Sequence, residues 1–117
     1  MKIQWLPEPE EHDYPAAASY LTLLMDFSEV KLFITHLKAN PVQEFKAKDI
    51  FRASGLSLLG ISNAHVKKDQ KKIEDGKKIS PLLLVRKDGK LIIADGYHRL
   101  CAIYALDEDA LIKCKIV

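Results

Sequence analysis

The chain has 117 residues, of which 48% are hydrophobic and 29% charged, and its formal net charge is +2 at pH 7. That length predicts one compact domain over residues 1–117, and the small net charge gives no general attraction to nucleic acid. No stretch approaches the roughly 18 consecutive apolar residues of a membrane span. The acidic, proline-broken run 5–11 does not resemble a signal peptide, so we expect a cytoplasmic protein without a membrane partner.

The first half of the chain predicts an arm followed by helices. Residues 1–14 are irregular in pattern, and we expect Trp5 and Leu6 to pack on the body of the protein. A helix over residues 16–25 follows, with Pro15 in its first turn and Asp13 as its cap. Apolar residues at helical spacing then predict a helix that starts at 28–29 and ends at Asn40-Pro41.

The middle of the chain predicts two more helices around an ambiguous segment. The pattern of residues 46–53 suits a short helix that Gly55 ends. Residues 56–61 form either a brief strand or a packed loop. Asn63 is a favourable cap for a helix over residues 64–75, which Gly76 closes.

The last third predicts a hairpin, a helix and a strand. The apolar run 81–85 is typical of a strand that is buried on both faces, and the turn 87–90 returns the chain into a second strand over 91–94. An apolar helix over 98–106 follows. Alternating residues over 112–116 predict a half-exposed last strand. We therefore expect an α/β or α+β fold, with a small mixed sheet flanked by helices.

The junction between the second strand and the helix is the strongest functional signal. It reads Asp95-Gly96-Tyr97-His98-Arg99. A helix start offers backbone amides without internal partners and the positive end of the helix dipole, and glycine permits a close approach of the ligand. Arginine adds donors that match phosphate geometry. The segment therefore predicts an anion site, most simply for a phosphate.

Each side chain of this junction has a competing structural role. Asp95 either binds a ligand or metal, or caps the helix. His98 contacts phosphate, acts as acid or base, or stabilises the turn. Tyr97 stacks on a base or packs on the sheet. Arg99 otherwise pairs with an aspartate of the turn 107–109.

The order of elements and this junction resemble the ParB/sulfiredoxin-like superfamily over residues 61–117, with residues 1–60 as a helical N-terminal extension. The superfamily includes the ParB N-terminal domain, sulfiredoxin and an ADP-dependent free-serine kinase. The resemblance implies that Gly96, His98 and Arg99 contact nucleotide phosphates and that Asp95 faces a nucleotide or a metal.

The differences from these families narrow what the resemblance implies. Tyr97 stands where sulfiredoxin has its catalytic cysteine, which argues against sulfiredoxin chemistry. The ParB partition protein has arginine at the position of His98 and a DNA-reading domain that does not follow here. The motif most similar to this one is the Asp-Gly-His-His-Arg of the serine kinase.

Other polar groups are weaker candidates. His65 and Lys68, near the start of the 64–75 helix, supply a second set of nucleotide contacts or face solvent. A cluster at 46–49 completes the pocket in one interpretation, through Lys46, Lys48 and Asp49. The acidic arm offers cation ligands in Glu8, Glu10, Glu11 and His12, or is simply solvated.

Three further residues favour structural roles. Cys101 and Cys114 lie in apolar patterns and suit buried, reduced thiols. His36 lies on a helix beside apolar residues and suits a partly buried packing position.

The leading hypothesis is a nucleotide- or phosphate-binding protein, either a small-molecule phosphotransferase or a nucleotide hydrolase. We expect Asp95 and His98 as its catalytic residues and Mg²⁺ as the metal that accompanies the nucleotide. Gly96, Tyr97, His98 and Arg99 hold the phosphate, and Arg99→Ala is expected to leave the fold intact while removing anion binding.

Two hypotheses compete with this one. The first is a non-catalytic module in which nucleotide occupancy sets a protein partnership. The second is a DNA-associated protein, which predicts salt-sensitive binding through Lys71 and Lys72. The N-terminal helices either cover the site or form a homodimer surface.

Overall fold

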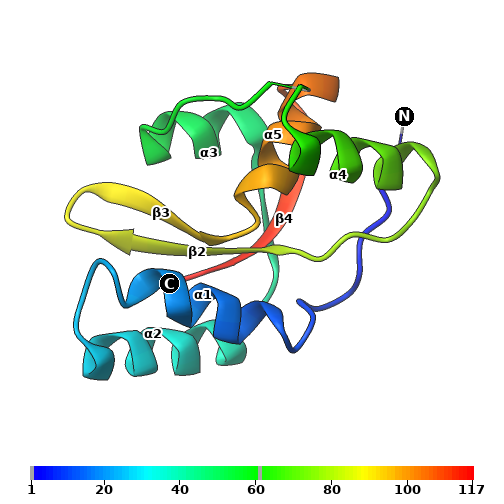
Figure 1. The fold of residues 1–117 in the computed structure, drawn as a ribbon. Helices are drawn as coiled ribbons and strands as arrows, with labels where there is room; N and C mark the ends of the chain where they lie inside the picture. The colour runs from blue at the N-terminus through cyan, green and yellow to red at the C-terminus, as the bar shows by residue number, and fades with distance from the viewer. Residues whose placement is uncertain (1, 61) are drawn as a thin grey trace.

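The structure, a computed structural model, describes residues 2–60 and 62–117, and these form three layers (Figure 1). A four-stranded sheet lies between helices α1 and α2 on one face and helices α3, α4 and α5 on the other. The elements run α1 (Asp13–Leu21), α2 (Phe27–Ala39), β1 (Gln43–Lys46), α3 (Ala47–Ser54), α4 (Ala64–Glu74), β2 (Leu82–Lys87), β3 (Lys90–Asp95), α5 (Tyr97–Leu106) and β4 (Leu111–Ile116).

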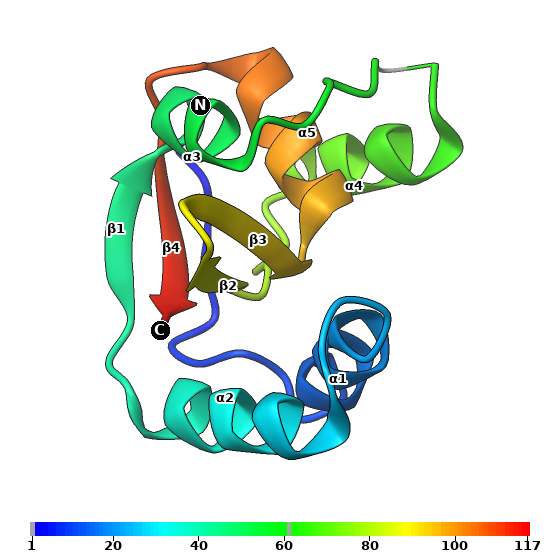
Figure 2. The same ribbon diagram turned by 90° about the vertical axis from the view of Figure 1, so that its left-hand side faces the viewer.

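The sheet is mixed and has the strand order β1-β4-β2-β3. β4 pairs antiparallel with β1 and parallel with β2, while β2 and β3 form an antiparallel hairpin. The last strand of the chain is thus a central strand. β1 and β3 are the two edges, and β3 ends where α5 begins (Figure 2).

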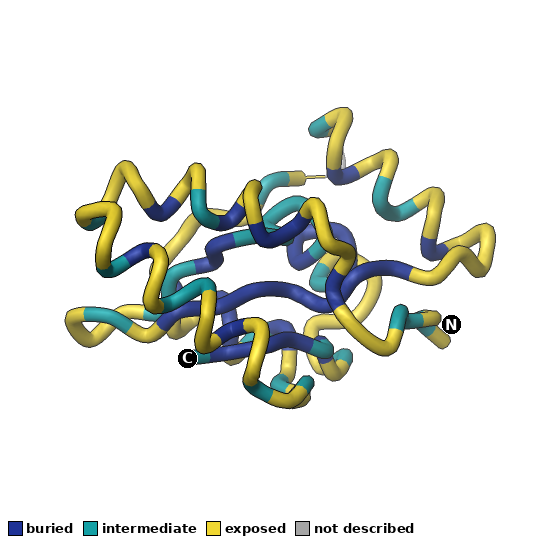
Figure 3. Tube along the Cα trace, turned by 90° about the horizontal axis from the view of Figure 1, so that it is seen from below, coloured by how far each residue is buried: buried dark blue, intermediate teal, exposed yellow. Residues whose placement is uncertain are grey.

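Two hydrophobic cores lie on opposite faces of the sheet because β2 alternates between them. Leu82 and Leu84 pack toward α3, α4 and α5, whereas Leu83 and Val85 pack toward α1 and α2. All four are fully buried. The predicted apolar run is buried on both faces for this reason. Figure 3 shows the buried central strands between helices whose outer faces are exposed.

Local signals in the sequence are confirmed at several helix ends and at the hairpin. Asn63 caps α4 by accepting hydrogen bonds from the backbone amides of His65 and Val66, at 3.0 and 3.2 Å. Gly55, with φ +68°, follows α3, as its sequence position predicts. Asp88 and Gly89 both have positive φ, the geometry of a tight hairpin turn.

The N-terminal arm is also confirmed for its described residues. Trp5 packs on the core and bridges Ile79, and the Leu6 amide donates to the Ile79 carbonyl at 2.8 Å. Residues 56–60 form a loop, whereas Ile61 lies outside the described residues. No described helix is both long enough and apolar enough to cross a bilayer.

Two predictions about local structure are wrong, and one strand was not predicted. Asp13 is the first residue of α1, with no side-chain cap bond at this helix start, because its carboxylate is engaged elsewhere. β1 was not expected, since four largely exposed residues carry no clear pattern; it forms by pairing with β4. His36 is exposed rather than partly buried, because Leu37 takes the inward position on α2.

The interpretation of β4 as half-exposed is wrong at Lys115, which is 2% exposed. Its ammonium donates to the Lys38 carbonyl at 3.0 Å and pairs with Glu8 at 2.9 Å. Burial lowers the pKa of Lys115, but Glu8 and Tyr14 outweigh it, so the pKa is raised. A lysine can lie on this central strand because its charge meets an acceptor and a carboxylate at the sheet end.

Candidate functional site

A β-bulge in β3 turns Asp95 toward the α1 side of the sheet. Between two pairs of opposed residues, Leu83–Asp95 and Leu84–Ile93, β2 advances by one residue and β3 by two, so Ala94 is the extra residue. Opposed residues share a face of the sheet, so Asp95 lies on the face of Leu83, which packs toward α1. Without the bulge, strand alternation would place the Asp95 carboxylate on the opposite face.

Gly96 makes the corner between β3 and α5, where any other residue would be strained. Its φ is +100°, and it precedes the first helical residue, Tyr97. A Cβ at this position would lie 2.7 Å from Leu82 Cγ and 2.9 Å from Arg99 Nη2. The glycine thus serves the packing of the corner. It also brings the amides of the first turn, which have no intrahelical acceptors, to the mouth of a pocket.

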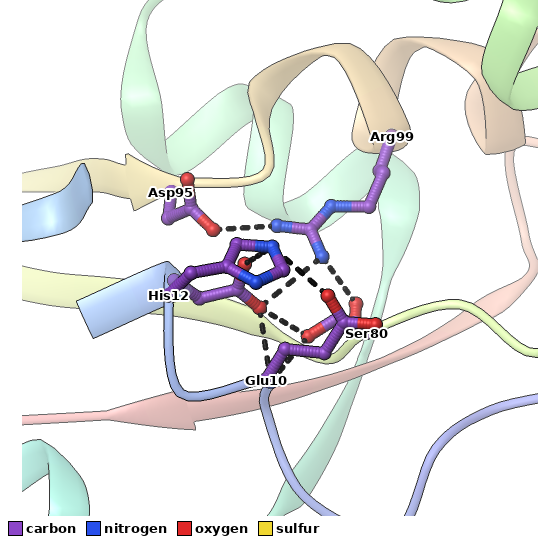
Figure 4. A network of polar contacts seen from close by, with 6 residues as sticks. Glu10, His12, Ser80, Asp95 and Arg99 are labelled. Atoms are coloured by element: carbon purple, nitrogen blue, oxygen red, sulfur yellow. Dashed lines mark hydrogen bonds and ion pairs between the residues drawn. The ribbon is translucent and has the colours of Figure 1, made fainter. Parts of the chain in front are cut away.

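Arg99 points back along α5 into a network of acceptors (Figure 4). Its Nη2 donates to Asp95 Oδ2 at 2.7 Å and its Nη1 to the Ser80 carbonyl at 2.9 Å. Nη1 also lies 3.8 Å from Asp13 Oδ2. The Arg99 side chain is only 14% exposed. The predicted alternative partners Asp107 and Asp109 are thus replaced by carboxylates from α1 and β3.

The N-terminal arm closes the other side of this network. The Ser80 hydroxyl donates to Asp13 Oδ2, and the Glu10 amide donates to the same oxygen at 3.2 Å. His12 Nε2 lies 2.9 Å from Glu10 Oε2 and 3.4 Å from Asp13 Oδ1. Arg99 thereby joins the start of α1, the entry to β2 and the end of β3 into one polar unit.

A pocket of about 340 Å³ opens over this unit. Its lining includes four carboxylates and three permanent cations, and these are Glu10, Asp13, Asp69, Asp95, Lys72, Lys78 and Arg99. Arg99 is already paired, whereas Lys72 and Lys78 are exposed and take part in no ion pair among the described residues. The pocket therefore combines carboxylates that lie near Arg99 with two lysines whose ammonium groups can bind an anion.

The pKa of Asp95 is raised by these surroundings. Burial raises the pKa of Asp95; the Arg99 guanidinium opposes that rise, and the neighbouring Asp13 adds to it. Asp95 does not cap α5, because no side-chain cap bond is present at Gly96. Of its two predicted roles, helix capping is excluded, and its carboxylate is bonded to Arg99.

Glu10, His12 and Asp13 form one cluster of metal-ligating atoms, all within 4.8 Å of one another. Two carboxylates and an imidazole suit a borderline cation such as Zn²⁺ or Mn²⁺ as well as Mg²⁺. Of the arm residues predicted as cation ligands, only Glu10 and His12 lie in this cluster. Glu8 instead pairs with Lys115, and Glu11 is exposed outside the pocket lining.

The structure brings Tyr97, His98 and His65 together beside the pocket. The rings of His65 and His98 are 4.9 Å apart between centroids, and both Tyr97 and His98 line the pocket. The Tyr97 hydroxyl donates to the Ser57 carbonyl, and burial raises the pKa of its phenol. Tyr97 also packs against the core, which agrees with the packing role predicted for it.

Two groups that were considered as contributors to the pocket lie outside its lining, and Lys68 faces solvent, the second of the two alternatives for it. Lys68 is exposed one helical turn before Lys72 on α4 and lines a neighbouring hollow with Lys67 and Lys71, whereas Lys72 lines the pocket. The 46–49 cluster lies at the end of β1 and the start of α3, and none of its residues lines the pocket. There Lys48 pairs with Asp109 at 2.7 Å, and Lys46 lies 3.8 Å from the same carboxylate.

Sequence reasoning missed Ser80, Lys78 and the part of Asp13 in the pocket. Ser80 and Lys78 precede β2 and lack any local pattern. Their place in the pocket follows from the pairing of the N-terminal arm with Ile79, which leads the arm across the entry to β2 and which the sequence does not indicate. Cys101 and Cys114 are free, buried thiols as predicted, and burial raises the pKa of Cys114 to about 12.

Compared with known proteins, the chain matches no family model, no curated protein and no solved structure. The mixed α+β fold is therefore established from the structure alone. The resemblance to the ParB/sulfiredoxin-like superfamily stays a prediction that rests on the 95–99 motif and the order of elements.

Proposed function

We propose that this protein binds a nucleotide or phosphorylated small molecule, as its Mg²⁺ complex, at the start of α5. The observation that carries the proposal is the composition of the pocket. The lining holds the carboxylates of Asp13, Asp95 and Glu10 and the first turn of α5. It also holds the ammonium groups of Lys72 and Lys78, which form no ion pair within the described part of the chain. A phosphate that carries a divalent cation complements both kinds of group.

The division of labour follows from the contacts. The phosphate accepts hydrogen bonds from the backbone amides of Tyr97 and His98, and the ammonium groups of Lys72 and Lys78 neutralise its negative charge. Arg99 acts mainly by positioning, because its guanidinium holds Asp95 and the Ser80 carbonyl. His98 stands at the mouth, where a protonated imidazole adds a donor.

A phosphotransferase or nucleotide hydrolase is the activity that this arrangement suits. Phosphoryl transfer needs positioning and neutralisation of charge rather than covalent participation of the protein. In this proposal Asp95 and His98 are the catalytic residues. The carboxylates orient the metal-bound phosphate, and His98 moves a proton at the attacking or leaving oxygen.

Thermal melting tests the proposal. ATP, ADP, CTP, GTP, AMP and inorganic phosphate are each added with and without Mg²⁺ to the wild type, to Lys72→Gln and to Lys68→Gln. A ligand at a hundred times its Kd adds about 2.7 kcal/mol, or roughly 10 °C in Tm.

Lys68→Gln is the matched control, because it removes the same charge one helical turn away, from a residue outside the pocket lining. We expect the wild type and this control to shift together and Lys72→Gln to shift less. No shift with any ligand at millimolar concentration would contradict the proposal.

A second candidate, the non-catalytic nucleotide-responsive module, is favoured by the corner between α1 and α2. Leu23 is 81% exposed and Phe27 72%, and apolar side chains exposed at one corner can contact a partner. α1 begins at Asp13 in the pocket and ends beside this corner, so occupancy at one end can reach the other. Nucleotide binding without turnover would select this candidate.

A further inference from the structure

The sheet face beneath α3 carries a second pocket, separate from the one at α5. Its volume is about 450 Å³, and α3 and all four strands line it. Buried Leu84 and Ile116 form its floor on the sheet, and buried Ile50 of α3 together with half-buried Phe45 and Leu91 completes its apolar lining. It lies at the hairpin end of β3, about 17 Å from Asp95 at the usual rise of a strand.

A small residue of α3 lies at the edge of this pocket. Ala53, in the last turn of α3, lines the pocket with a single methyl group. The volume lies within the range of about 300 to 1,000 Å³ typical of small-molecule sites. A larger side chain at position 53 would occupy this space, which gives a direct way to close the pocket.

The mouth of the pocket carries positive charge that the protein does not neutralise. Arg86 and Lys90 are exposed, and no described carboxylate lies within ion-pair distance of either. The other two charged lining residues are paired: Lys87 with Glu29, and Asp49 with Arg52 at 3.6 Å. An apolar floor beneath two free cations suits a ligand that is apolar at one end and anionic at the other.

We propose that this pocket binds a small apolar carboxylic acid, with its tail on the floor and its carboxylate at Arg86 and Lys90. The guanidinium fork of Arg86 matches a carboxylate, and Lys90 adds a second positive charge at the rim. The proposal is independent of phosphate binding at α5, because the two pockets share no lining residue.

Calorimetric titration with octanoate and with 1-octanol, its uncharged counterpart, tests the proposal. The proteins are the wild type, Ala53→Phe, Arg86→Gln and Lys113→Gln. The last is the matched control, since Lys113 is a sheet lysine outside this pocket, 3.5 Å from Glu44. A circular-dichroism melt establishes that each variant folds, and Ala53→Met replaces Ala53→Phe if the latter does not.

We expect octanoate to bind the wild type and Lys113→Gln equally and to lose binding in Ala53→Phe. Arg86→Gln should weaken octanoate about fivefold and leave 1-octanol unchanged. Absence of octanoate binding to the wild type at millimolar concentration would overturn the proposal. So would binding that survives Ala53→Phe, or an equal loss of both ligands in Arg86→Gln.

Discussion

The positively charged side chains at the two ends of β3 differ in burial and in pairing. At the Asp95 end, Arg99 is largely buried and its guanidinium is bonded to Asp95 and the Ser80 carbonyl. At the Lys90 end, Arg86 and Lys90 are exposed, without a carboxylate partner among the described residues. An arginine at a helix start can therefore be occupied by acceptors of the protein itself, even where its sequence position favours the binding of an anion.

The largest expected effect is that of Arg99→Ala. The structure reverses the expectation from sequence that this variant keeps its stability, because it leaves Asp13 and Asp95 close together and without their cation. We expect a loss of about 3 kcal/mol in the free energy of unfolding, measured in urea. Arg52→Ala, whose side chain is 82% exposed, is the control and should unfold like the wild type. An unchanged free energy of unfolding in Arg99→Ala would show that the contacts of Arg99 do not stabilise the fold.

Gly96→Ala should come next, at about 2 kcal/mol. Its Cβ would overlap Leu82 and Arg99, and its φ of +100° strains any other residue. Chemical denaturation again provides the measurement. Gly60→Ala serves as the control, because a Cβ there meets only Ser62 Oγ at 3.9 Å. Equal stability of the two variants would show that the corner at α5 tolerates a side chain.

Lys72→Gln should have a smaller effect, and on binding rather than on stability. We expect the Kd of the Mg²⁺-nucleotide to rise about fivefold, since one exposed charge contact is lost. Fluorescence titration of a labelled nucleotide measures it. If Lys68→Gln weakens binding as much as Lys72→Gln does, the lysines act as a diffuse basic surface and the pocket is not the site.

The smallest effect expected is a change of pH dependence in Asp95→Asn. Burial raises the pKa of Asp95 in the folded protein, so the folded state binds the proton more tightly than the unfolded state. Wild-type stability should therefore decline relative to the variant as the pH rises from below 3.8 through the raised pKa. Urea melts across this range measure the difference in slope. A wild type that instead gains stability over this range would show that Arg99 outweighs burial.

Much of the fold was predictable because the signals are local. The caps at Asn63 and Gly55 and the hairpin at Asp88-Gly89 each depend on a few neighbouring residues. β1 and the burial of Lys115 were not predictable, because they depend on pairing and contacts across the sheet.

The site was predictable only in its centre. The 95–99 motif located the pocket, but the partners of Arg99 come from α1 and from the residue 19 positions earlier, Ser80. The bulge at Ala94 determines the face of the sheet on which Asp95 lies, and no pattern of residues in the sequence predicts this bulge. On α4, helical spacing alone did not separate Lys72, which lines the pocket, from Lys68, which does not.

Backbone amide chemical shifts test the central claim most directly. The ¹⁵N-labelled protein is titrated with ADP and Mg²⁺, and in parallel with inorganic phosphate. Our account predicts that the largest shifts cluster at Gly96, Tyr97, His98 and Lys72, while Lys90 at the opposite end of β3 from Asp95 stays unchanged. Shifts confined to the hairpin 86–90, or no shifts at saturating millimolar ligand, would contradict the assignment of the phosphate site to the start of α5.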